Sequence, residues 1–139
     1  MTIDRAQEML EQMVNDLPEV IFNELNGGVL LLPESKRSPE ARADDLFIMG
    51  EYVVRHDMGR MVKIYYGSFV KLYGENAPDE LWEKELRHTL HHELTHHLEH
   101  LAGENDLEVE DDIRMYLYHN YMDMSQAEEI MKQLKKKKK

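Results

Sequence analysis

Apolar residues recur at helical spacing in two parts of the chain. Between residues 3 and 16 they follow the i, i+3, i+4, i+7 rule, and Thr2 can cap the first turn. A longer helix is predicted to begin near Pro78, because proline suits the first turn of a helix. Gly103 is a suitable residue to end it.

Between these helices the pattern changes to short runs of β-forming residues. Residues 29–32 are an apolar run, and 34–45 form a charged loop. Residues 46–55 and 60–69 are two further strand candidates, separated by the turn sequence HDMG and expected to pair as a hairpin. This order predicts an α+β fold, with a short mixed β-sheet packed against an N-terminal helix and the long helix.

A single folded unit is expected from 139 residues, of which 42% are hydrophobic. We assign residues 1–124 to this domain and residues 125–139 to a C-terminal helix with a lysine-rich tail. Ser125 and Glu128 form a capping box that predicts the start of that last helix.

The chain is acidic, with 28 Asp and Glu residues against 17 Lys and Arg residues. Six of the basic residues fall in the last eight positions, KQLKKKKK, so the rest of the chain is more acidic still. Nucleic-acid binding needs a basic surface, and the composition argues against it. No apolar run is long enough to span a membrane, and the first residues do not resemble a signal peptide. We therefore expect a cytoplasmic, bacterial protein, with its oligomeric state left open.

The long helix has two faces of different chemistry. Leucines recur on one face, which must lie against the core: Leu86, Leu90, Leu94, Leu98 and Leu101. Histidines recur about 200° away around the helix, facing a cleft or water: His88, His92, His96 and His100.

The histidine face contains the pattern H-E-x-x-H at His92, Glu93 and His96. Imidazoles at i and i+4 lie one turn apart, so both can reach one Zn²⁺ at about 2.0–2.1 Å. A glutamate directly after the first histidine lies beside the metal and can take a proton from water bound there. With no cysteine in the chain, His, Asp and Glu must supply every metal ligand.

The stretch HHELTHHLEHLAGENDLE resembles the bacterial single-domain zincin-like metallopeptidases, or minimal zincins. The resemblance implies that His92 and His96 bind zinc and that Glu93 is the general base. It also implies an acidic third ligand just past a glycine, for which Asp106 in Gly103-Glu104-Asn105-Asp106 is the first choice. Other residues compete for this role: Glu104, Glu108, Glu110, Asp111 and His119. The glycine comes four residues later than in the compact form of the motif.

The resulting hypothesis is a zinc-dependent metallohydrolase, a peptidase acting on a peptide or protein substrate. By the same resemblance, a strand within 60–69 would border the cleft and bind the peptide by strand addition. His91 and His97 flank the histidine face, and one of them would contact a carboxylate behind the site. Two other readings stay open: a non-catalytic, metal-binding interaction module, and a plain α+β domain with a histidine-rich surface.

Overall fold

A computed structural model describes residues 1–39, 46–57 and 59–103 of the chain. It has an α+β architecture with a small mixed sheet and an N-terminal helix, which confirms the predicted fold class. The predicted final helix from Ser125, and with it the segment 125–139, lies outside the described residues. In chain order the elements are α1 (Ile3–Asn15), the 3₁₀ helix η1 (Glu19–Phe22), β1 (Gly28–Leu32), β2 (Lys36–Arg37), β3 (Phe47–Ile48), β4 (Gly50–Arg55), β5 (Gly59–Tyr65), α2 (Tyr66–Tyr73) and α3 (Asp79–Gly103).

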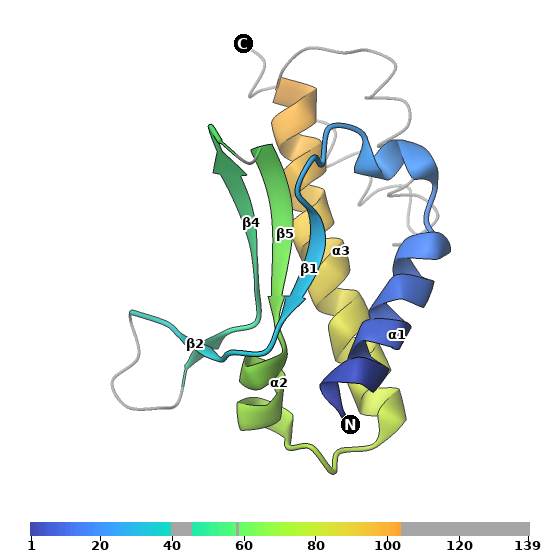
Figure 1. Ribbon diagram of the computed structural model, residues 1–139, viewed down its shortest axis with the longest axis vertical. Helices are drawn as coiled ribbons and strands as arrows, with labels where there is room; N and C mark the ends of the chain where they lie inside the picture. Colours follow the sequence, from blue (N-terminus) through green and yellow to red (C-terminus); the bar gives the residue numbers. More distant parts are fainter. Residues whose placement is uncertain (40–45, 58, 104–139) are drawn as a thin grey trace, which may run out of the picture.

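The main sheet has the strand order β1-β5-β4, so β5 is central and β4 is an edge strand. β5 pairs in parallel with β1 and antiparallel with β4, which places Val62 opposite both Val29 and Tyr52. Short strands β2 and β3 form a separate antiparallel ribbon. Helix α3 runs along the sheet, and α1 packs beside α3 (Figure 1).

The predicted hairpin is confirmed, because β4 and β5 pair and the chain turns between Arg55 and Gly59. Gly59 has a φ of 77°, a conformation that glycine adopts without strain. The predicted strand 60–69 was too long, since it ends at Tyr65 and α2 follows. Gly67 in the first turn of α2 lies against the Glu34 backbone: its amide donates to the Glu34 carbonyl at 3.1 Å, and a Cβ there would lie 2.5 Å from that backbone.

Both predicted amphipathic helices form: α1 ends at Asn15 and α3 begins at Asp79, each within a residue of its expected limit, and α3 is helical up to Gly103, the last residue of the described range. Thr2 caps α1 by accepting a hydrogen bond from the Arg5 amide at 3.2 Å. The leucine face of α3 is buried as predicted: Leu86, Leu90, Leu94, Leu98 and Leu101. Two aromatic residues are buried in the same core, Trp82 and Phe69.

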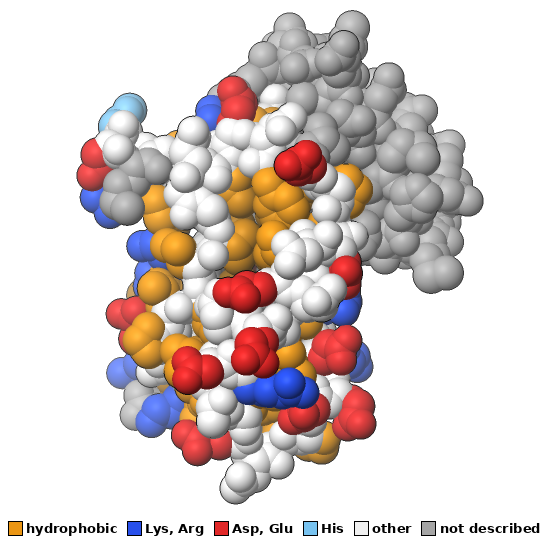
Figure 2. All heavy atoms as spheres, turned by 45° about the vertical axis from the view of Figure 1, so that its right-hand side comes forward, with side chains coloured by type: hydrophobic (Ala, Val, Ile, Leu, Met, Phe, Trp, Pro, Cys, Tyr) orange, Lys and Arg blue, Asp and Glu red, His pale blue; other side chains and the backbone are white. Residues whose placement is uncertain are grey.

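The opposite face of α3 remains accessible. His88 is exposed, and His92, His96 and His100 line a cleft, as the helical spacing predicted. Acidic side chains are spread over the surface that carries α1 (Figure 2), in keeping with the net charge of −11.

We expect Leu86→Ala to lower the free energy of unfolding by about 2–5 kcal/mol, because it leaves a cavity in a closed core. Leu86 is completely buried, whereas Leu72 is 53% exposed on α2 and serves as the matched control. Leu72→Ala should change stability by less than about 0.5 kcal/mol. Urea unfolding followed by circular dichroism measures both, and equal losses would contradict the assigned core.

Candidate metal centre

Helix α3 brings two histidine nitrogens to the separation that a shared metal ion requires. His92 and His96 lie one turn apart, and their Nε2 atoms are 3.2 Å from each other. Their rings meet edge to face, with centroids 4.8 Å apart. Two nitrogens bound at about 2.0–2.1 Å to a tetrahedral zinc ion would be about 3.3–3.4 Å apart. The separation of the two donor atoms therefore suits one zinc ion.

The two histidines line a cleft of about 920 Å³ between α3 and the edge strand β4. The strand side is formed by Gly50, Glu51, Tyr52 and Val54. The expectation that a strand within 60–69 borders the cleft is therefore wrong. β5 is the central strand and its backbone is paired on both sides, and among the described strands β4 is the edge strand that lines the cleft.

Glu93 lies at the base of the cleft, directly after His92 in sequence and largely buried at 7% exposure. Burial raises the pKa of Glu93 above its ordinary value. The neighbouring His92 and His96, and a hydrogen bond from the backbone N–H of Tyr52, act in the opposite direction. A buried carboxylate with a raised pKa beside two potential metal ligands has the properties of a general base.

Gly50 allows the edge strand to lie directly against the helix at this point. A Cβ on Gly50 would be 2.7 Å from Cγ2 of Thr89 and 3.2 Å from Cγ of Glu93. A larger residue at this position would force the Thr89 and Glu93 side chains, or the strand, to shift. The sequence contained a signal for this contact, a lone glycine inside a β-forming run, but nothing that identified the surface it meets.

His97 is part of the core and does not line the cleft. It is fully buried, with Nδ1 2.8 Å from the Tyr52 hydroxyl and Nε2 2.9 Å from the Asn23 carbonyl oxygen. From the sequence, we expect His91 or His97 to contact a carboxylate. The two ring nitrogens of His97 lie instead beside the Tyr52 hydroxyl and the Asn23 carbonyl oxygen. Burial lowers the pKa of His97 and so favours the neutral ring.

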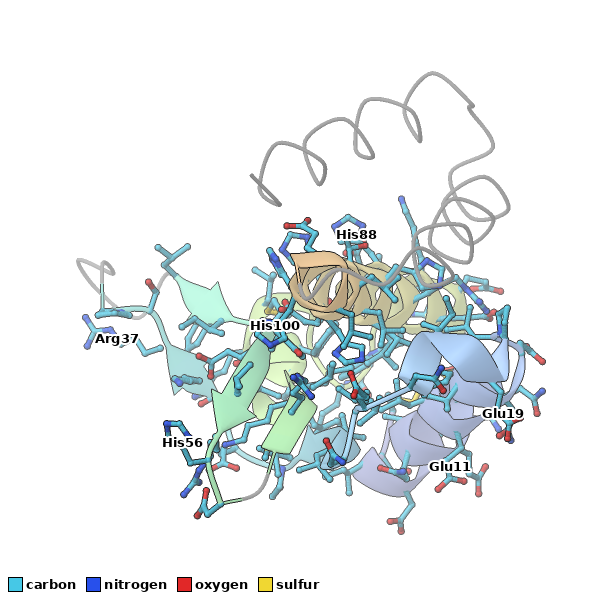
Figure 3. The ribbon with its side chains drawn as sticks, turned by 90° about the horizontal axis from the view of Figure 1, so that it is seen from above. Glu11, Glu19, Arg37, His56, His88 and His100 are labelled. Atoms are coloured by element: carbon cyan, nitrogen blue, oxygen red, sulfur yellow. The ribbon has the colours of Figure 1, made fainter. Side chains whose placement is uncertain are left out.

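Among the described residues, no third His, Asp or Glu joins the pair to complete a metal site. Asp106, the first choice for the third ligand, lies outside the described residues. The same is true of its competitors: Glu104, Glu108, Glu110, Asp111 and His119. His100 and Glu99 line the cleft beyond His96, and Figure 3 shows His100 on the side of α3 that faces the strands.

Comparison with known proteins places the chain in a family. No protein-family model matches the sequence, and no curated protein is significantly similar to it. A solved structure described as a conserved hypothetical protein from Thermus thermophilus is 34% identical, with a TM-score of 0.64. The match covers 75% of this chain and 100% of that protein. The chain therefore belongs to the same family as this protein, whose description names no activity.

Within the described parts of the chain, none of the helices combines the length and the apolar character that a membrane crossing demands.

We expect the purified protein to contain about one zinc ion per chain, measured by elemental analysis after preparation without chelators. His96→Ala should abolish zinc binding, because one of the two converging nitrogens is lost. His88→Ala is the matched control, since His88 is an exposed histidine on the same helix outside the 3.2 Å pair. Zinc retained in His96→Ala would refute the site. Several weakly held ions per chain would instead favour a histidine-rich metal-binding module.

Proposed function

We propose that this protein is a zinc-dependent metallohydrolase that cleaves peptide bonds. The observation that carries the proposal is the 3.2 Å separation of the His92 and His96 Nε2 atoms, with the buried Glu93 carboxylate beside them in an open cleft. The sequence resemblance to minimal zincins supports the same assignment of residues. A zinc ion held there would polarise the substrate carbonyl and make water a nucleophile at neutral pH.

Glu93 is the residue to which we assign the proton transfers. Its carboxylate would take a proton from the attacking water and deliver it to the leaving amine. Burial supports this role because it raises the pKa of Glu93 and makes the carboxylate a stronger base than an exposed one. The Tyr52 amide would hold the carboxylate in place during both transfers.

A peptide substrate is supported by the open edge of β4 beside the cleft. Among the described strands none pairs with the outer edge of β4. The Tyr52 amide already donates to Glu93, so an added peptide strand would pair with other backbone groups of this edge. Side chains of β4 alternate: Tyr52 reaches His97, whereas Glu51 turns to the other face and accepts a hydrogen bond from Tyr65 at 2.7 Å. These side-chain contacts hold the strand on both of its faces.

We further propose that the protein acts in the cytoplasm, on peptides or proteins and not on nucleic acid. The absence of cysteine suits a reducing compartment, and the acidic composition disfavours a polyanionic partner.

Glu93→Gln should retain one zinc ion per chain and lose turnover by about a hundredfold or more, because an amide cannot accept the proton. Activity is measured on a fluorescence-quenched peptide library, with zinc content determined on the same samples. The control is Glu83→Gln, which removes an exposed carboxylate paired with Arg87 on the same helix. Wild-type turnover in Glu93→Gln would eliminate the mechanism.

Asp106→Ala should lower zinc affinity by about two orders of magnitude or more, because catalytic zinc sites have three protein ligands. The dissociation constant is measured by competition with a chromophoric chelator. An unchanged affinity would exclude Asp106 and direct the same experiment to Glu104, Glu108, Glu110, Asp111 and His119.

A further inference from the structure

Tyr52 of β4 is held at both ends by residues of α3 that lie one turn apart. Its backbone N–H forms a hydrogen bond with the Glu93 carboxylate, and its hydroxyl oxygen lies 2.8 Å from Nδ1 of His97. Glu93 and His97 are at i and i+4, so they project from the same side of the helix. Tyr52 of the edge strand is therefore hydrogen-bonded both to the proposed general base and to a buried histidine.

The protonation state of His97 follows from its partners. The Asn23 carbonyl can only accept a hydrogen bond, so Nε2 of His97 carries the proton and donates at 2.9 Å. In a neutral ring Nδ1 is then an acceptor, and the Tyr52 hydroxyl donates to it. Both nitrogens are occupied and the side chain is completely buried, which leaves His97 without a free nitrogen for a metal ion.

These bonds connect three segments that are distant in sequence. His97 lies 45 residues from Tyr52 and 74 residues from Asn23, which follows η1. The Tyr52 and His97 rings are also packed together, with centroids 5.3 Å apart. Because His97 is shielded from water, its hydrogen bonds are directional constraints that solvent cannot easily replace.

We propose that His97 is a positioning residue: acting through Tyr52, it sets the distance between β4 and α3 and thereby orients Glu93 in the cleft. This inference rests on the proposed hydrolase function. Gly50 shows why the distance is sensitive, since β4 already touches Glu93 there with no room for a Cβ. Displacements of about 1 Å at a catalytic group can cost about a hundredfold in rate.

Three variants separate this role from general packing. Tyr52→Phe removes only the hydroxyl. His97→Asn keeps an amide near the position of Nδ1 and can still bind the Tyr52 hydroxyl, whereas His97→Gln keeps one near Nε2 and can bind only Asn23. The control is Tyr73→Phe, which removes a half-buried tyrosine hydrogen bond to Glu85, 3.1 Å long, outside the cleft.

The readouts are zinc content, kcat and KM on one quenched peptide selected with the wild-type protein, and hydrogen exchange of the Tyr52 amide by NMR. We expect Tyr52→Phe and His97→Gln to retain zinc. In both variants kcat should fall about tenfold or more while KM changes little. The backbone amide of residue 52 should exchange its hydrogen about tenfold faster than in the wild type. His97→Asn should restore most of kcat, and Tyr73→Phe should match wild type in all readouts.

The outcomes distinguish the two proposals. Zinc-free or inactive wild-type protein would overturn the proposed function and this inference with it. Active wild-type protein with normal kcat in Tyr52→Phe would overturn only the role of His97. In a third outcome, His97→Asn and His97→Gln lose kcat equally and thermal stability equally. That result would show that His97 contributes only to packing, and it would overturn the inference as well.

Discussion

Burial of the leucine face of α3 against the sheet fixes how the helix is oriented and which of its side chains remain accessible. Once Leu90 and Leu94 enter the core, the helical period leaves His92 and His96 on the accessible side, one turn apart. The same packing brings α3 against β4, so the accessible side becomes one wall of a cleft. The geometry of the candidate metal centre is thus a consequence of how the hydrophobic core is closed.

The base of the cleft and the adjoining core contain polar groups that a purely apolar core would avoid, Glu93 in the first and His97 in the second. Removing a carboxylate and an imidazole from water is costly unless both find partners. Glu93 has the Tyr52 amide, and His97 has the Tyr52 hydroxyl and the Asn23 carbonyl. Each of these partners is a backbone group or a neutral side chain. The hydrogen bond from Tyr52 offsets only part of the cost of burying Glu93, whose pKa stays raised.

Local features were predictable from the sequence, because they depend on residues a few positions apart. The limits of α1, the start of α3, the β4–β5 hairpin, and the opposed leucine and histidine faces all follow from periodicity, capping and turn residues. The pairing of His92 with His96 belongs to the same class, since an i, i+4 spacing on a helix brings two side chains together in any fold. Glu93 follows from the same motif.

Features that join distant segments were decided by the tertiary structure. The parallel pairing of β1 with β5 makes β4 the edge, and this overturned the prediction that a strand within 60–69 lines the cleft. No spacing in the sequence links Tyr52 to His97, or His97 to Asn23. The side chains that α3 presents to the cleft could be read from the sequence, because helical periodicity is local. The strand that faces them could not, because strand order and buried hydrogen bonds depend on the packing of the whole chain.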